Sequence, residues 1–152
     1  MPRNSHLNWE VNYEPGTLEA IGYKKGKKIT TKVETTGNAF KVVLSTDKTI
    51  LTADGKDATV VNVSITDDQG REVPVADNKV QFFLSDGAKI IGVGNGDPSA
   101  HEPDKCREGA WQRSAFNGKC QVIILAGTKP GTVTLEAKSG GLQSDSTPLT
   151  LK

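Results

Sequence analysis

The sequence predicts an all-β protein, an antiparallel β-sandwich preceded by a short β-meander. Apolar residues alternate with polar residues in short runs, which is the period of a half-buried strand. Turn residues separate these runs at short and regular intervals, as they do in sandwich folds. The chain contains 16 glycines and many Val, Thr and Ile residues, a composition that favours strands and turns, and it has no run of helical period.

The clearest predicted strand is Thr59–Thr66, which follows the Asp54–Gly55 turn. Every second residue is aliphatic, so Val61, Val63 and Ile65 should point to one face. The remaining strands of the sandwich show the same alternation, with these residues predicted to point inward: Phe40, Val42, Leu44, Val80, Phe82, Leu84, Cys120, Val122, Ile124, Val133, Leu135, Ala137, Leu149 and Leu151. The run 118–125 is apolar on both faces, which indicates a central strand or a covered outer face.

Residues 7–36 are predicted to form a separate unit of three strands, the first of them around Trp9 and Tyr13. Three short strands leave one apolar face uncovered, and these residues cannot supply a second layer. We expect this segment either to pack on the sandwich or to mediate self-association. The boundary falls near Gly37, so the predicted domains are residues 1–37 and 38–152.

Charge and hydropathy exclude several classes of partner. The net charge is +1, from 19 basic and 18 acidic residues, which provides no field to attract nucleic acid or an anionic membrane. The basic cluster Lys24–Lys28 is interpreted as a solvated hairpin turn. No apolar run is long enough to cross a bilayer, so we expect neither a nucleic-acid partner nor membrane insertion.

The strand pattern stops between Gly94 and Arg113, where the candidate site residues are found. Trp111 could stack on a sugar ring while Asn95, Asp97 or His101 binds its hydroxyl groups. The alternative is an ordered connection, packed by Trp111 and by the two prolines of the loop. The loop lacks the ligand spacing of a metal site, and we expect no metal and no cofactor.

The two cysteines, Cys106 and Cys120, leave two outcomes open. They could form one disulfide bond, which export would favour. Cys120 lies in a strand pattern, however, and a free buried thiol is the common state of such a cysteine.

Two long segments of the sequence carry a family resemblance. TADGKDATVVNVSITDDQGREVPVADNKVQFFLS and FNGKCQVIILAGTKPGTVTLEAKS resemble bacterial immunoglobulin-like domains of the invasin/intimin type. SHLNWEVNYEPGTLEAIGYKKGKKITTKVETTG resembles the junction that closes an accessory β-domain in the β-galactosidases of glycoside hydrolase family 2. GNGDPSAHEPDK and AFNGKCQVII resemble the C-terminal immunoglobulin-like domain of the same enzymes.

This resemblance implies a C-terminal fragment of a large exported glycosidase, with residues 1–37 as the last strands of a truncated accessory β-domain. In that family the catalytic glutamates lie on an upstream (β/α)₈ barrel of about 250 residues, for which this chain has no room. No glutamate here matches a catalytic motif, so we expect a fragment without catalytic residues.

The implied role is structural, in the periplasm or outside the cell as part of the parent protein. The module would pack against sister domains, and the 94–113 loop would shape the rim of an active site. Two alternatives are a carbohydrate-binding module and an immunoglobulin-like repeat of a surface adhesin.

Overall fold

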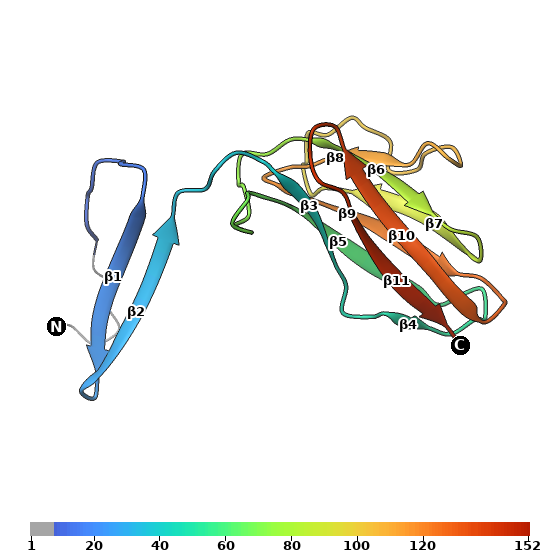
Figure 1. Ribbon diagram of the computed structural model, residues 1–152, viewed down its shortest axis with the longest axis horizontal. Coiled ribbons are helices and arrows are strands. Elements are labelled where there is room, and N and C mark those ends of the chain that lie inside the picture. The colour runs from blue at the N-terminus through green and yellow to red at the C-terminus, as the bar shows by residue number, and fades with distance from the viewer. Residues whose placement is uncertain (1–7) are drawn as a thin grey trace. The chain divides into compact units, whose positions relative to one another are not determined.

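The computed structural model describes residues 8–152, which divide into two compact units, one ending at Thr35 and one spanning Thr36–Lys152. Residues 1–7, which belong to the predicted first domain, lie outside the described part, as does the first residue of the predicted self-association segment. The described residues contain eleven strands and no helix (Figure 1): β1 (Thr17–Lys24), β2 (Lys27–Glu34), β3 (Lys41–Ser45), β4 (Ile50–Leu51), β5 (Ala58–Thr66), β6 (Lys79–Leu84), β7 (Ala88–Gly94), β8 (Gln112–Ser114), β9 (Lys119–Ala126), β10 (Gly131–Ser139) and β11 (Asp145–Leu151). Between residues 8 and 152 there is accordingly no helix long and apolar enough to span a membrane.

The first unit contains a two-stranded hairpin. Strands β1 and β2 pair antiparallel from Thr17 opposite Glu34 to Lys24 opposite Lys27. The two turn residues, Lys25 and Gly26, have φ angles of 49° and 77°, which is the left-handed conformation that suits a tight hairpin. The lysines of this turn are exposed, in agreement with the prediction of a solvated turn.

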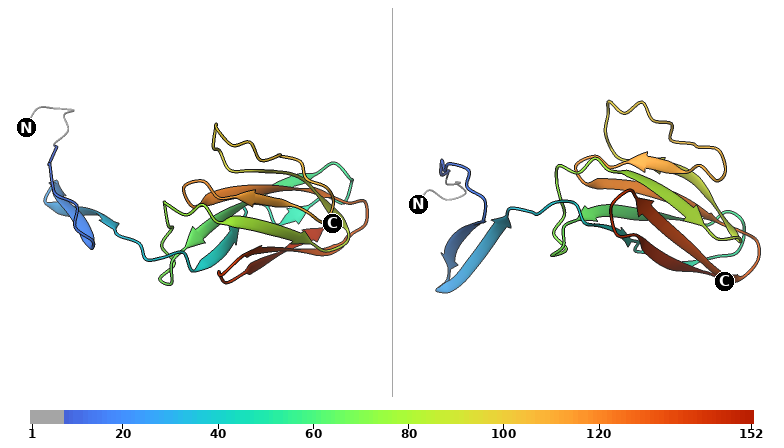
Figure 2. Two further views of the ribbon diagram at one scale, coloured as in Figure 1. Left: turned by 90° about the horizontal axis from the view of Figure 1, so that it is seen from above. Right: turned by 45° about the horizontal axis from the view of Figure 1, so that its top comes forward.

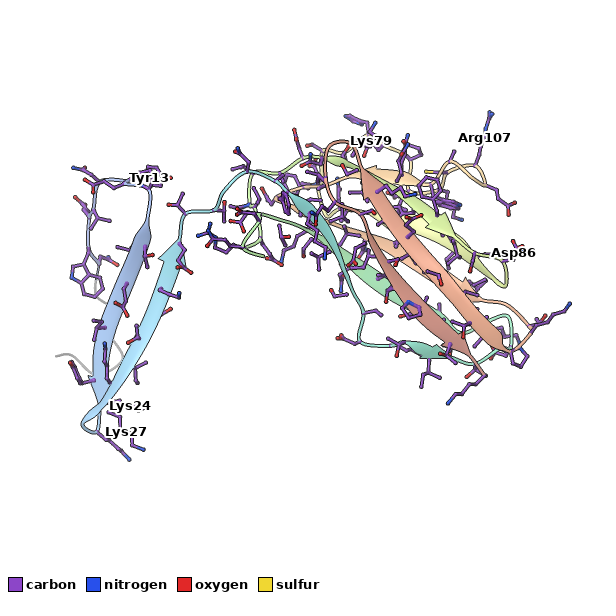
Figure 3. All side chains as sticks on the ribbon, in the orientation of Figure 1. Tyr13, Lys24, Lys27, Lys79, Asp86 and Arg107 are labelled. Atoms are coloured by element: carbon purple, nitrogen blue, oxygen red, sulfur yellow. The ribbon has the colours of Figure 1, made fainter. Side chains whose placement is uncertain are left out.

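The predicted strand around Trp9 and Tyr13 does not form. Residues 8–14 have no strand partner among the described residues, and the side chains of Trp9 and Tyr13 are 70% and 78% exposed. Tyr13 projects from the segment that precedes β1 (Figure 3). Alternation alone does not make a strand, because an extended segment also needs a neighbour for its backbone hydrogen bonds. The predicted three-stranded meander is therefore a two-stranded hairpin.

The second unit is a sandwich of two sheets (Figure 2). One sheet has the order β3-β5-β9-β7 and the other has the order β4-β11-β10-β6-β8. These orders correspond to the A-B-E-D and G-F-C sheets of an immunoglobulin fold, in which β3, β5, β6, β7, β9, β10 and β11 take the places of strands A to G. Strand β4 pairs parallel with β11, and β8 adds to the other edge beside β6.

The core lies between the two sheets and confirms the predicted alternation. In β5, Val61, Val63 and Ile65 are buried, while Val60 and Asn62 on the opposite face are exposed. Most of the other predicted inward residues are buried in the same cluster: Val42, Val80, Phe82, Cys120, Val122, Ile124, Val133, Leu135, Ala137, Leu149 and Leu151. Leu44 and Leu84 are only half-buried. The prediction for Phe40 is wrong, because this residue precedes β3 and is 43% exposed. Strand β9 lies between β5 and β7, which explains its apolar residues on both faces.

Candidate functional site

The loop with the candidate site residues connects β7 to β8. The predicted irregular segment ended at Arg113, but in the structure Gln112–Ser114 form β8, which pairs with β6. Arg113 lies opposite Val80, an inward residue, and therefore points into the molecule. The irregular part of the loop is residues 95–111.

Arg113 organises this loop from inside. Its side chain is only 5% exposed. One terminal nitrogen, Nη1, donates to the backbone oxygen of Glu102 at 3.0 Å and to the carboxylate of Asp104 at 2.8 Å, and Nη2 donates to Oδ1 of Asn95 at 3.0 Å. Its Nε has no hydrogen-bond partner among residues 8–152 and lies 3.9 Å from the Glu102 carboxylate. One planar guanidinium thus joins the beginning of the loop to its middle.

Glu102 forms the second connection within the loop. Its carboxylate accepts hydrogen bonds from the backbone N–H of Ser114 at 2.8 Å and from the Ser114 hydroxyl at 2.9 Å. Lys79, at the start of β6, lies 3.4 Å from the same carboxylate. The hydrogen bond from the Ser114 N–H is the main reason that the pKa of Glu102 is lowered, since it stabilises the charged form.

The loop also covers part of an open sheet edge. Strand β7 is the last strand of its sheet, and β9 is its only partner strand in the described part of the chain. On its other side, the N–H of Val93 donates to the backbone oxygen of Asp104 at 2.9 Å. An unpaired edge invites pairing with other chains, so this contact protects the edge of β7.

The candidate carbohydrate contacts at the start of the loop already have partners within it. Asn95 is occupied within the loop, since its side-chain N–H donates to the backbone oxygen of Ser114 at 2.9 Å and its Oδ1 accepts from Arg113. Asp97 accepts hydrogen bonds from the N–H and hydroxyl of Ser99 at 2.8 and 2.7 Å. His101 is exposed. Asn95 and Asp97 therefore lie near each other at the start of the loop, and both side chains already form hydrogen bonds with other loop residues.

Trp111 lies on the core side of the loop. Its backbone oxygen accepts a hydrogen bond from the N–H of Phe82 at 2.9 Å, which continues the ladder between β6 and β8. The Trp111 side chain is half-buried and packs against the hydrophobic core. This position favours an ordered connection anchored by its tryptophan, and contact between Trp111 and a carbohydrate stays a prediction.

A hollow of about 560 Å³ lies where the loop meets the outer face of β7 and β9. Its floor contains Ile91 and Ile123, and the glycines Gly92, Gly94 and Gly96 leave it open because they lack side chains. The loop supplies a polar wall, which includes Asn95, Asp97, Glu102, Asp104, Lys105 and Arg113.

The cysteines are free thiols in the structure rather than the disulfide bond that the sequence left open. Cys120 points from β9 into the core, and burial raises the pKa of its thiol to about 12. Cys106 lies in the loop with its sulfur 3.9 and 3.8 Å from the backbone oxygens of Pro103 and Gln112. Among residues 8–152, no group of three or more His, Cys, Asp or Glu side chains is placed to hold a metal ion.

Six carboxyl groups among the described residues are stabilised in their charged form. Each carboxyl group that has a shifted pKa is shifted downward, because hydrogen bonds and nearby cations favour its charged form: Asp54, Asp57, Asp67, Glu72, Asp97 and Glu102. A general acid that works near neutral pH needs the opposite shift. These carboxylates can accept hydrogen bonds and pair with cations, but they are poor proton donors.

A comparison with family models covers both units of the chain. Residues 42–148 match the family described as glycoside hydrolase family 2 C-terminal domain 5. The chain belongs to this family. Residues 1–30 match a second model, described as a domain of unknown function (DUF4982).

Similar proteins are members of the same glycosidase family or carry the names of its enzymes. The chain is 41% identical over 141 residues to the beta-galactosidase BoGH2A of Bacteroides ovatus, which covers 92% of this chain and 16% of that protein. It is 33% identical over 125 residues to a putative beta-glucuronidase of Formosa agariphila, which covers 80% of this chain and 12% of that protein. Among solved structures, a glycosyl hydrolase family 2 member from Bacteroides cellulosilyticus aligns with a TM-score of 0.88 at 31% identity, over 95% of this chain and 18% of that one.

These comparisons establish that the chain is a C-terminal immunoglobulin-like domain of glycoside hydrolase family 2 with a short preceding segment. The chain spans less than a fifth of the length of each of the three proteins. The activity of a parent enzyme thus lies beyond what this segment shows.

Sequence reasoning missed the role of Arg113, which it placed in a polar loop. A signal was present, since Trp111, Arg113 and Ala115 follow the two-residue period of a strand and all three point toward the core. Because buried arginines are rare unless they are paired, a charged residue at position 113 was expected to be exposed, and the strand pattern was not recognised.

Proposed function

We propose that this chain is a non-catalytic accessory module of a family 2 glycosidase, in which it packs against sister domains of the parent protein. The observation that carries the proposal is the family match over residues 42–148, together with a sandwich whose polar loop is held by its own side chains. The parent would be a β-galactosidase or a β-glucuronidase, since the relatives carry both names.

The carboxyl groups support the non-catalytic part of this proposal. Hydrolysis of a glycosidic bond needs two carboxyl groups that face each other across a cleft, one of them with a raised pKa. In the hollow beside β7, the pKa values of Asp97 and Glu102 are both lowered, by hydrogen bonds from Ser99 and from Ser114 respectively. Neither of these two carboxyl groups is therefore prepared to donate a proton, which supports a role without catalysis.

The hairpin supports the packing part. Leu18 and Val33 lie opposite each other on one face of the hairpin and are 59% and 70% exposed. A hairpin with an apolar face is marginal in water unless a further layer covers it. Since this segment matches a different family model from the sandwich, we propose that it completes the β-domain that precedes the sandwich in the parent protein.

The experiment compares the parent protein with a truncated form that ends before residue 38. If the sandwich packs against sister domains, its removal lowers the melting temperature of the remaining protein by several degrees, because one packed interface is lost. A melting temperature that stays the same, together with unchanged activity and solubility, would show that the sandwich is an independent appendage.

Three further expectations stay predictions. The first is export, which fractionation of cells that produce the parent protein would test. The second is self-association of the separate chain through residues 7–36, for which light scattering should show a mass that rises with concentration. The third is a contribution of the 94–113 loop to the rim of an active site, which loop deletions in the parent would reveal as an altered KM.

Carbohydrate binding and a role as an adhesin repeat were the two alternatives from the sequence. Binding of a sugar at the loop would quench or enhance Trp111 fluorescence in a Trp9→Phe variant during an oligosaccharide titration. The half-buried position of Trp111 favours a flat response.

A further inference from the structure

The outer face of the β3-β5-β9-β7 sheet carries a continuous apolar patch. Val60 of β5 lies directly opposite Ile123 of β9, and Ile123 lies opposite Gly92 of β7. The strand β7 bulges between Ile90 and Gly92, and the intervening Ile91 is exposed beside this row. Leu125 extends the row along β9. We call Val60, Ile91, Ile123 and Leu125 the aliphatic patch.

Two of the four members of this patch are well exposed to solvent, and the other two are partly exposed. Val60 is 42% exposed and Ile91 is 39% exposed, whereas Ile123 and Leu125 are half-buried by their neighbours. Aliphatic side chains on adjacent strands are about 5 Å apart, so the four form one surface rather than scattered contacts. Contiguous apolar surface of this kind usually marks a contact with another protein surface.

The opposite sheet offers a different surface. The outward residues of β10 are polar, including Thr134, Glu136 and Lys138. Phe83 lies beside them and is 45% exposed, and the Lys138 ammonium lies 5.2 Å from its ring centre and pairs with Glu136 at 2.9 Å. Phe83 is thus surrounded by polar side chains, whereas the aliphatic side chains on the other sheet adjoin one another, and this contrast favours the β3-β5-β9-β7 face for packing.

The hollow beside the aliphatic patch makes this face of the sheet concave. Ile91 and Ile123 belong to both the patch and the floor of the hollow, and Gly92 leaves space above them. A side chain at position 92 would start within 3.7 Å of both the Ile123 side chain and the Asp104 backbone oxygen, and would fill that space. An apolar floor inside a polar rim is the anatomy of an interface that receives a protruding side chain.

We propose that the aliphatic patch and its hollow are the docking surface for a sister domain of the parent glycosidase, which inserts an apolar side chain over Ile91 and Ile123. This inference rests on the proposed function and names the surface that performs it. More than four fifths of each similar protein lies outside the matched segment, so a covalently attached partner is available. Because both domains belong to one chain, each is present at a high effective concentration near the other, and a small apolar patch is then sufficient for stable docking.

The test measures how fast single cysteines react with a maleimide in the separate chain and in the parent protein. The background variant is Cys106→Ser, in which Cys120 is buried and slow to react. Val60→Cys and Ile91→Cys report on the docking surface, and Thr134→Cys is the control on the opposite sheet. All three positions lie on the sandwich surface, and circular dichroism checks that each variant folds.

We expect Val60→Cys and Ile91→Cys to react at least about tenfold more slowly in the parent protein, while Thr134→Cys reacts at an unchanged rate. Protection of Thr134→Cys alone would overturn the choice of face and leave domain packing intact. If each of the three cysteines reacts at the same rate in the parent protein as in the separate chain, both the choice of face and the proposed packing function are overturned.

Two other results would also overturn the inference by naming a different occupant. Protection that appears in the separate chain as its concentration rises would assign the patch to a second copy. Protection that needs added sugar would assign the hollow to a carbohydrate. As an independent measurement, Val60→Asp should lower the melting temperature of the parent protein by more than that of the separate chain, and equal shifts would contradict docking.

Discussion

The carboxylate of Asp67 accepts a hydrogen bond at 2.9 Å from the backbone N–H of Gly37, 30 residues earlier in the chain. Asp67 is itself buried and also accepts hydrogen bonds from the N–H groups of Gln69 and Arg71 and from the Arg71 side chain, at 2.8 to 3.0 Å. One side chain thus closes the turn after β5 and fixes the chain where it enters the sandwich.

Asp67 makes the stability of the sandwich depend on pH. Burial alone would raise its pKa, but the hydrogen bonds from Gly37, Arg71 and Gln69 outweigh burial and hold the pKa well below the ordinary value of 3.8. A carboxyl group with a lowered folded-state pKa stabilises the protein above its unfolded pKa, and this contribution is lost as the pH falls toward the folded-state value. The free energy of unfolding should therefore fall from pH 6 to pH 3, and Asp67→Asn should flatten that fall.

The control for this experiment is the exposed neighbour, Asp68. Asp68→Asn should keep the pH dependence of the unmodified chain, as measured by urea denaturation at each pH. An Asp67→Asn variant with an unchanged pH dependence would show that Asp67 is not among the groups responsible.

The glycine of the Asn117–Gly118 turn meets a second constraint besides its φ angle of 77°. A Cβ atom at Gly118 would lie 2.4 Å from the backbone oxygen of Val73. Gly118→Ala should therefore destabilise the sandwich by about 2–4 kcal/mol, through backbone strain and overpacking together.

Gly141 provides the matched control, because it has nearly the same φ angle of 78° but no atom within 4 Å of its Cβ position. Gly141→Ala should cost only about 1 kcal/mol, the strain of the left-handed conformation. Equal losses for the two variants in chemical denaturation would mean that the close approach of Val73 does not matter.

The hydrogen bonds of Arg113 predict that the 95–111 loop depends on this one side chain. Arg113→Ala leaves Glu102, Asp104 and Asn95 without their shared donor, and we expect a loss of about 2–4 kcal/mol in unfolding free energy. Trypsin should then cleave the loop faster at Lys105 and Arg107.

Arg107 extends outward from the loop (Figure 3) and serves as the control. Arg107→Ala should change stability by less than about 0.5 kcal/mol, since the residue is exposed. Unchanged cleavage at Lys105 in Arg113→Ala would contradict the role assigned to the guanidinium.

The two thiols should differ in reactivity. At pH 8 the folded chain should react quickly at Cys106, while Cys120 should react only after unfolding, since its thiol is buried and its pKa is raised to about 12. Mass spectrometry after alkylation would count the modified thiols. A chain that resists alkylation at both cysteines until a reductant is added would show instead that they form a disulfide bond.

The sandwich was predictable because its strands carry their own pattern. The alternation of Val61, Val63 and Ile65 specifies which face is buried, and the apolar faces of β9 specify its central place. Long-range pairing is less visible in the sequence. The residues around Ile50 do not indicate that β4 pairs parallel with β11. Strand pairing uses backbone N–H and C=O groups, which nearly every residue has, so side-chain type does not specify the partner strand.

The candidate site was less predictable, for two physical reasons. Residue type suggested that Trp111 and Asn95 contact a carbohydrate, which stays a prediction. The pattern did not show that the register of β8 turns Trp111 toward the core or that Asn95 accepts a hydrogen bond from Arg113. The expected strand around Trp9 failed because a pattern of side chains does not specify a backbone partner.

The central claim, that this chain is a non-catalytic module of a glycosidase, is tested most directly by hydrolysis of aryl β-galactosides and β-glucuronides. The account predicts that the parent protein hydrolyses at least one of these substrates and that the separate 152-residue chain hydrolyses neither. Turnover by the separate chain that survives repeated purification, or a parent protein inactive on both substrates, would contradict it.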